Sequence, residues 1–187
     1  MQPYKKLYTY WFSVIIYDRE VEFAEKWIKS WKLKEQMDGA ARSGKQNIVE
    51  GSDDMDVSLK VAINLTGIAK GSLEELTGDL EDFLRQRKLD KWDKNDPRVL
   101  LLRAKSAQLV RNLSDLSVLS KEREAEELLK TIELPEQSEE AANFLLTLCH
   151  QATLLLHRQV EALKLKHQKE GGLSEELHRK RREYRGY

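Results

Sequence analysis

The sequence predicts an all-α protein, and three observations support this class. Apolar residues recur at alternating spacings of three and four over long segments, which is the period of a helix packed on one side. Leu and charged residues dominate the chain. Proline occurs only at positions 3, 97 and 135, each at the start of a periodic segment, where a helix tolerates it.

The first helix is predicted over residues 4–31. Its apolar positions from Leu7 to Trp31 fit one helix face, although the stretch YWFSVIIYD is β-branched and aromatic and also fits a strand. The charged segment that follows contains no turn signal, so we expect one long helix. A second helix is expected over residues 33–51, with Gly51 at its end.

The third helix, predicted over residues 55–88, has the clearest pattern in the chain. Spacings of three and four continue without interruption through Leu59, Ala62, Thr66, Ala69, Leu73, Leu76, Leu80 and Phe83. This pattern is the heptad seam that bundled helices use to pack against one another.

Three more helices are predicted after residue 92. The first covers residues 97–120, and the segment 121–134 either continues it or forms a further turn. A long helix follows over residues 136–169 and ends at Gly171–Gly172. The last is a short basic helix over residues 174–185.

These elements predict three parts of the chain. Residues 1–92 contain the first three helices, residues 93–135 form a helical extension, and residues 136–187 contain a long closing helix and the basic C-terminal helix. Either the helix at 97–120 or the one at 136–169 can close a bundle with the first three. The longer apolar face of the second favours it.

Charge is balanced overall but segregated along the chain. Lys and Arg total 32 and Asp and Glu total 32, which weakens a broad attraction to nucleic acid or to anionic membranes. Basic residues still form two clusters beside aromatic residues, a composition that pairs phosphates and stacks bases. The candidate nucleic-acid-binding residues are Arg85, Arg87, Lys88, Lys91, Arg179, Lys180, Arg181, Arg182 and Arg185. The alternative is that both clusters are solvated faces.

The stretch Gly39–Gln46 looks like a phosphate-binding loop but lacks its context. Gly39, Gly44 and Lys45 have the required spacing, whereas Gln46 replaces the hydroxyl that binds magnesium. Helical sequence precedes Gly39 where a phosphate-binding loop requires a strand. We therefore interpret the small residues as a helix face that allows close packing.

A second group of small residues lies in the third helix. Gly67, Gly71 and Gly78 fall within roughly 40° of one another at about 100° per residue. Each glycine weakens a helix relative to Ala, so a close neighbour is expected to justify all three. That neighbour is either another helix of the same chain or a second subunit.

Catalytic chemistry is not evident in the sequence. Cys149 lies in an apolar run typical of a buried residue, and His150 and His157 have no third metal ligand nearby. We expect no enzyme, no cofactor and no metal. The chain begins without a signal-peptide pattern and contains no run of about 18 apolar residues. We therefore expect a cytoplasmic protein with no membrane partner.

One pair of motifs resembles a known family. AARSGKQNIVEGS followed by IAKGSLEEL is similar to the bacterial four-helix-bundle proteins that include the ribosomal-RNA intervening-sequence proteins and, more distantly, retroelement accessory proteins. The C-terminal segment from Ala141 resembles the suffix region of one branch of this family. The matching motif positions are Arg42, Ser43, Asn47, Ile48, Glu50, Gly51, Gly71, Ser72, Leu73, Glu74, Glu75 and Leu76.

The resemblance implies an antiparallel four-helix bundle with additional C-terminal helices. It also implies a ring-like homo-oligomer, a pentamer in some members, that associates with structured RNA or with an RNA-handling partner. Within the motif we interpret Arg42, Asn47, Glu50 and Glu75 as a structural latch. A buried ion pair of Arg42 with Glu75 or Glu50 would hold two helices in register.

Two functions are therefore expected for the chain. The first is non-enzymatic binding of structured RNA by a homo-oligomer. The alternative is a protein–protein adaptor, in which the acidic segment 121–140 meets a basic partner or the basic tail of another subunit. Binding through phosphates weakens steeply with salt and apolar docking does not, so salt dependence separates the two.

Overall fold

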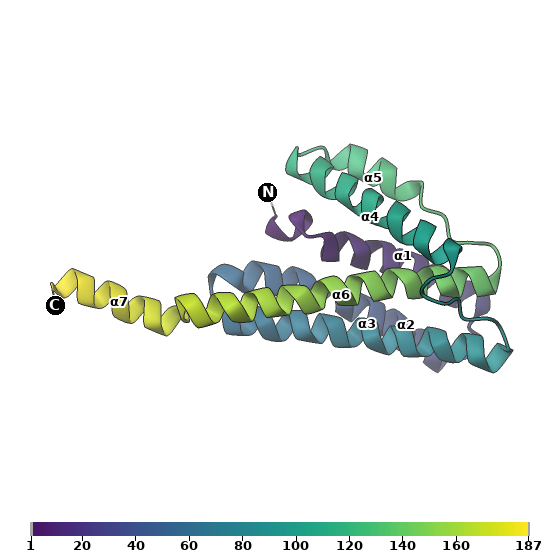
Figure 1. The fold of residues 1–187 in the computed structure, drawn as a ribbon, viewed down its shortest axis with the longest axis horizontal. Helices are drawn as coiled ribbons and strands as arrows, with labels where there is room; N and C mark the ends of the chain where they lie inside the picture. The colour runs from purple at the N-terminus through teal and green to yellow at the C-terminus, as the bar shows by residue number, and fades with distance from the viewer. Residues whose placement is uncertain (1, 187) are drawn as a thin grey trace.

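The protein is helical throughout the part that the structure describes. This computed structural model describes residues 2–186, with the backbone alone at residues 56 and 173–175, and no strand occurs in that range. The prediction of an all-α class is confirmed. Figure 1 shows an elongated arrangement in which the last helix, α7, extends past the other helices.

The N-terminal segment departs from the predicted single helix. A 3₁₀ turn, η1 (Pro3–Lys6), comes first, and α1 (Tyr8–Trp27) begins after the extended Leu7. The chain is extended again at Ile28, and the Ser30 hydroxyl accepts a hydrogen bond from the Leu33 amide at 3.3 Å. Ser30 thereby caps a new helix, so the predicted boundary at residue 31 was wrong by one turn.

Helix α2 (Trp31–Asp53) extends two residues past each predicted end. Helix α3 (Leu59–Arg87) is present as predicted but begins four residues later, because a second 3₁₀ turn, η2 (Asp54–Asp56), precedes it. The stretch that looks like a phosphate-binding loop, residues 39–46, lies inside α2. Every position of the predicted α3 seam is buried except Leu59, which is half-buried at the helix start.

The remaining elements form a lateral hairpin and a long C-terminal arm. Helix α4 (Pro97–Val118) turns back into a short α5 (Glu122–Lys130), and α6 (Ser138–Glu170) then runs the length of the molecule. A break at Gly171, whose φ is +77°, precedes α7 (Leu173–Arg185). In Figure 1 the hairpin of α4 and α5 covers α1 on one side of the molecule.

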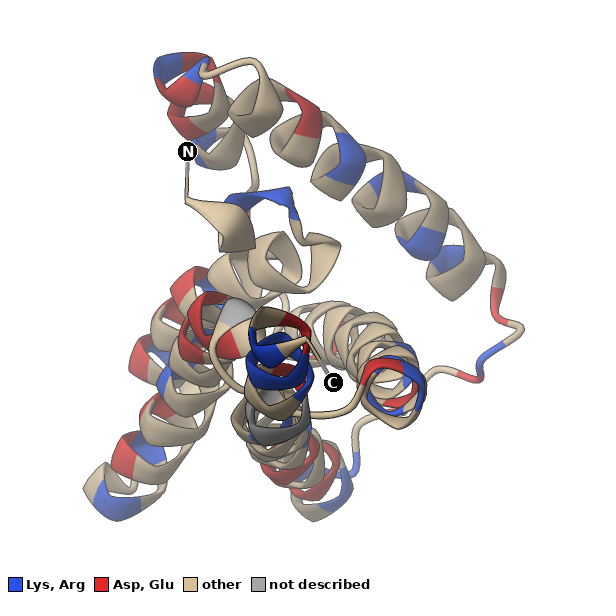
Figure 2. Cartoon of the chain, turned by 90° about the vertical axis from the view of Figure 1, so that its left-hand side faces the viewer, with Lys and Arg blue, Asp and Glu red and all other residues tan. Residues whose placement is uncertain are grey.

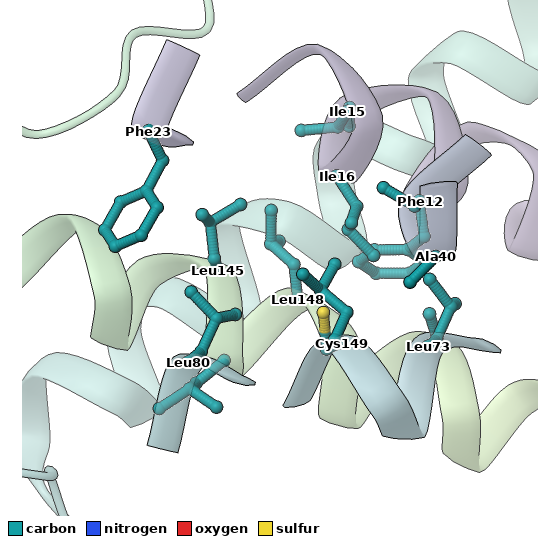
Figure 3. Packing of buried hydrophobic residues seen from close by; sticks show 14 of the residues in the cluster. Phe12, Ile15, Ile16, Phe23, Ala40, Leu73, Leu80, Leu145, Leu148 and Cys149 are labelled. Atoms are coloured by element: carbon teal, nitrogen blue, oxygen red, sulfur yellow. The ribbon is translucent and has the colours of Figure 1, made fainter. Parts of the chain in front are cut away.

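Four long helices enclose the main core. α2 packs on α3, α3 on α6, and α1 on both α2 and α6, while α4 makes fewer contacts with α6 and α1. Figure 3 shows side chains from all four meeting, among them Phe23, Leu80 and Leu148. Among the helices of residues 2–186, none is long and apolar enough to cross a membrane.

The apolar face of α6 changes phase along its length. Ala141, Leu145, Leu148 and Ala152 are buried as predicted, but the buried positions then shift to Leu156 and Leu163. A straight helix has about 3.6 residues per turn and a heptad has about 3.5, so positions seven apart rotate gradually around the helix. Over a long helix, the predicted apolar positions therefore turn away from the core. Ala162 is consequently exposed, and Gln159 accepts a hydrogen bond from the Thr9 hydroxyl at 3.2 Å.

Two different explanations apply to the small residues of α2 and α3. A Cβ at Gly44 would lie 2.9 Å from Leu73 Cδ2, and one at Gly51 would lie 3.2 Å from Leu65 Cβ, so these glycines permit close helix packing. At Gly39, Gly67, Gly71 and Gly78 a Cβ would meet no atom within 4 Å. Packing within the chain therefore does not account for the second group.

Candidate functional site

The basic C-terminal helix α7 stands apart from the body of the molecule. All five of its predicted binding residues are exposed, and Figure 2 shows their blue turns on the arm that points toward the viewer. Lys180 forms an ion pair with Glu176 at 2.6 Å. Arg179, Arg181, Arg182 and Arg185 have no ion-pair partner among the described side chains.

A hollow lies where α6, α7 and the start of α3 meet. It has a volume of about 460 Å³, and its charged lining residues are three cations, Lys166, Lys169 and Arg179, and two acids, Glu170 and Glu176. Glu176 is itself paired with Lys180, so cations outnumber acids in the lining. Ser58, whose hydroxyl accepts a hydrogen bond from the Val61 amide at 3.4 Å, lines it from the N-terminus of α3. Cations beside a helix N-terminus favour a bound phosphate group.

Sequence reasoning missed Lys166 and Lys169. The two are three positions apart near the end of α6, so they share a side of that helix. Their short distance in sequence from the basic tail could have indicated these two lysines. Only the turn at Gly171, however, places Arg179 beside them in space. Lys166 also lies 3.9 Å from Glu170, a surface pair that weakens its charge little.

The other predicted cluster, at the end of α3, is engaged with its own chain. Arg85 pairs with Asp82 at 2.7 Å, and Lys91 pairs with Glu81 at 3.1 Å. Arg87 donates to the Trp27 carbonyl at 3.1 Å, and its guanidinium lies 3.9 Å from the centre of the Phe83 ring. Lys88, in the left-handed conformation that ends α3, is exposed without such a partner among the described residues.

The two clusters lie at opposite ends of the molecule. The loop after α3 contacts the first turns of α6, whereas α7 follows its last turn. A helix of the length of α6 spans about 50 Å. One chain therefore presents two separate basic ends (Figure 1), not one continuous surface.

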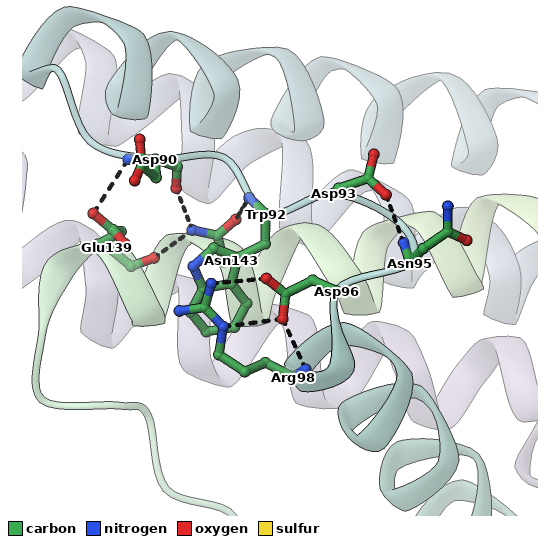
Figure 4. A network of polar contacts seen from close by, with 8 residues as sticks. All are labelled: Asp90, Trp92, Asp93, Asn95, Asp96, Arg98, Glu139 and Asn143. Carbon is green, nitrogen blue, oxygen red and sulfur yellow. Dashed lines mark hydrogen bonds and ion pairs between the residues drawn. The ribbon is translucent and has the colours of Figure 1, made fainter.

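A polar network holds the loop that follows α3 against α6. Asn143, which is buried on α6, donates to the carbonyls of Asp90 and Glu139 at 2.8 and 2.9 Å and accepts from the Trp92 amide at 2.8 Å. Arg98 pairs with Asp96 at 2.8 Å, and its guanidinium lies 4.0 Å from the Trp92 ring centre. Figure 4 shows these contacts fastening the loop to α6.

The predicted latch is wrong as a buried ion pair. Arg42, Glu50 and Glu75 are all exposed, because position 42 points away from the core-facing Ala41 and Gly44. The polar contact between α2 and α3 is instead made by Ser43 and Ser72, whose hydroxyls lie 2.9 Å apart. Asn47 supports it by donating to the Ser43 carbonyl at 2.9 Å.

Buried reactive groups lie elsewhere in the core. Burial raises the pKa of the Cys149 thiol to about 12, which keeps it protonated and unreactive. Glu20 is 0% exposed, and neither carboxyl oxygen has a hydrogen-bond partner among the described residues. Burial, and then the nearby negative charge of Asp38, raises the Glu20 pKa to about 9.

No set of three His, Cys, Asp or Glu side chains in the described part of the chain is arranged to hold a metal ion. Comparison of the chain with protein-family models, with curated proteins and with solved structures found no match. The geometry of the two basic ends is therefore the basis for a functional assignment.

Proposed function

We propose that this chain is a non-enzymatic, homo-oligomeric RNA-binding protein of the bacterial four-helix-bundle family that its motif resembles. In this proposal α1, α2, α3 and α6 are the antiparallel bundle, α4 and α5 are an extension, and α7 is the RNA-binding arm. The neighbour relations of the four long helices support the bundle. A ring, with five copies as the first size to test, follows from the resemblance alone.

One observation carries the RNA assignment. Four arginines on α7 form no ion pair with a described side chain, on a helix that projects into solvent, and Arg179 lines the hollow together with Lys166 and Lys169. Free cations beside a hollow attract a phosphate backbone, whereas cations already paired contribute little. In an oligomer each copy repeats the arm, so several modest sites act on one RNA.

The test compares equal losses of charge at the two ends. The double variant Arg179→Gln/Arg182→Gln removes two free cations, and Arg85→Gln/Lys91→Gln removes two paired cations at the α3 end. Fluorescence anisotropy with a labelled structured RNA should show weaker binding only for the first. Its slope of log affinity against log salt should shrink by about 1.4 to 1.8, the loss of two phosphate contacts. Equal effects at both ends would contradict an arm-specific site.

A protein adaptor is the second candidate function. Its support is the set of exposed apolar side chains on the outer hairpin, of which Leu100, Leu101 and Leu119 are more than half exposed. An adaptor would retain its partner at high salt, because apolar docking depends weakly on ionic strength. RNA binding that is absent at low salt in the anisotropy experiment would favour this function.

A further inference from the structure

An acidic groove runs along the outer side of α2 and α3. Its volume is about 690 Å³, and its floor is made of small residues that include Gly39, Ser43, Ser72 and Gly78. No Lys or Arg lines it. Because a Cβ at Gly39 or Gly78 would meet nothing within 4 Å, the chain's own packing does not require glycine there. The floor is shallow enough for another helix to approach closely.

The charges of the groove are only partly matched within the chain. Glu81 and Asp82 pair with Lys91 and Arg85, while Glu35, Glu75 and Asp79 have no ion-pair partner among the described residues. Burial, followed by the negative charges of Asp82 and Glu75, raises the pKa of Asp79. Such crowding of like charges is relieved by an incoming cation.

Helix α7 carries a complementary face. Leu177, Arg181 and Tyr184 fall within about 60° of one another, and the two apolar side chains are 45% and 93% exposed. Arg185 borders this face. Arg179 and Arg182 lie on the other side of the helix, about 140–200° from Leu177, and Arg179 lines the hollow beside α6. The outer face thus combines two anchors at helical spacing with arginine.

We propose that α7 of one copy docks through Leu177, Arg181 and Tyr184 into the α2–α3 groove of a second copy. This inference rests on the self-association in the proposed function and names the surfaces that produce it. It gives α7 two faces with separate tasks, since Arg179 and Arg182 remain free for RNA.

The lengths of the two surfaces favour a second copy over the chain's own tail. α7 has 13 residues and is about 20 Å long, and the groove from Ser72 to Asp82 spans about 15 Å. The arm begins beside Leu59, and Ser72 lies about 20 Å further along α3. An arm folded back on its own chain would therefore reach only the near edge of the groove.

The acidic segment of residues 121–140 is a weaker receptor for the tail. Its Glu122 pairs with Lys5 at 2.8 Å, Glu124 with Lys121 at 2.9 Å, and Glu127 with Lys130 at 2.9 Å. In the groove, Glu35, Glu75 and Asp79 lack such partners among the described residues, and they line a hollow that admits a helix. Because arm and groove are different surfaces, the contact is head-to-tail and repeats into a ring when the rotation closes.

Two single variants of the full-length protein test the docking. Gly78→Leu fills the groove, and the open space at Gly78 leaves its own fold intact. Arg181→Glu reverses the charge of the arm. Multi-angle light scattering after size exclusion should show the wild type as an oligomer and each variant with self-association weakened at least tenfold. Gly67→Leu is the matched control, because Gly67 is equally open but lies outside the groove.

A mixture of the two variants gives the decisive result. Gly78→Leu retains a working arm and Arg181→Glu retains a working groove, so the mixture should form a one-to-one heterodimer. The double variant Glu75→Arg/Arg181→Glu should recover part of the wild-type mass by exchanging the charges. Circular dichroism confirms that each variant is folded, and Glu75→Arg alone replaces Gly78→Leu should the latter unfold.

The outcomes separate this inference from the proposed function. A wild-type oligomer whose mass is unchanged in Gly78→Leu and Arg181→Glu overturns the docking and leaves self-association standing. A wild-type monomer overturns both. RNA binding is measured independently with Arg179→Gln/Arg182→Gln, so its loss or persistence decides the RNA assignment alone.

Discussion

The two basic ends of this protein have similar compositions and opposite environments. At the α3 end, Arg85 and Lys91 are paired with acids of the same helix, and the following loop is fastened to α6 by Asn143. At the α7 end, four arginines extend into solvent with no acidic partner among the described side chains. Whether a basic cluster is free to bind a ligand therefore depends on its acidic neighbours and on the contacts that anchor it. The number of Lys and Arg residues in the cluster does not predict this.

The largest expected effect comes from breaking the anchored end. Asn143→Ala removes three side-chain hydrogen bonds and leaves the Trp92 amide and the Asp90 carbonyl without their partner, while the Glu139 carbonyl keeps its bond within α6. The free energy of unfolding should fall by about 2–4 kcal/mol in urea denaturation. Asn112→Ala is the control, since the exposed Asn112 side chain accepts one surface hydrogen bond from Gln108, and it should change stability by less than about 0.5 kcal/mol.

The next effect concerns Glu20, a buried carboxyl group that lies beside another acid, Asp38, and has no cation paired with it among the described residues. Glu20 binds a proton in the folded state up to a pKa of about 9, well above its ordinary value of 4.5. The folded state therefore holds more protons than the unfolded state between these values, and stability should decrease as pH rises from about 5 to 9. The slope from one proton is at most about 1.4 kcal/mol per pH unit.

Replacing Glu20 sharpens the contrast with Asn143. Glu20→Met should raise the free energy of unfolding by about 1–3 kcal/mol at pH 8 and flatten the pH dependence, because an apolar side chain needs no partner there. Glu50→Met at an exposed site is the control. Denaturation curves at pH 5, 7 and 9 measure both quantities, and an unchanged slope would show that Glu20 is not the titrating group.

A smaller effect is expected from the exposed part of the anchored loop. Arg98→Ala removes the ion pair with Asp96 and the stacking on Trp92, but the Arg98 side chain is 56% exposed, so solvent screens the charge. The loss of stability should therefore be clearly smaller than that of Asn143→Ala. Arg98→Lys keeps the charge without the planar stacking, so a stability equal to that of the wild type would assign the effect to charge alone.

The smallest effect is expected at the free end. Arg182→Gln should change the free energy of unfolding by less than about 0.5 kcal/mol, because Arg182 has no described ion-pair partner. Thermal unfolding of this variant beside Arg98→Ala compares the two ends directly. A decrease of more than about 1 kcal/mol in the free energy of unfolding of Arg182→Gln would mean that α7 packs on the rest of the molecule. The two basic ends would then not differ in the way described.

The positions of the helices along the chain were predicted better than the directions in which individual side chains point. The α3 seam was correct because its Leu and Ala positions pack continuously between α2 and α6, so a strict period survives. The start of α1 was missed because a 3₁₀ turn has no apolar period. Arg42 was placed in the core although it is exposed, since one position along a helix is about 100° of rotation and motif letters do not fix that angle.

The candidate site was predictable only in part, for a similar reason. The five basic residues of α7 were identified from composition and all are exposed, while their binding of nucleic acid stays a prediction. The position of Arg179 beside Lys166 and Lys169 depends on the angle between α6 and α7, and the open space at Gly78 depends on what α2 and α3 leave uncovered. Both are properties of how helices pack, and neither has a local sequence signal.

Gly171 determines the direction in which α7 leaves the end of α6. Its φ of +77° and ψ of −174° form a backbone conformation that is essentially restricted to glycine, so a side chain there would force a different exit angle. An arm about 20 Å long acts as a lever, and a rotation of about 10° at Gly171 moves its tip by roughly 3–4 Å. Five copies in a closed ring turn by about 72° each and six by about 60°. In the proposed docking of α7 on a second copy, this one glycine would set how many subunits close the ring.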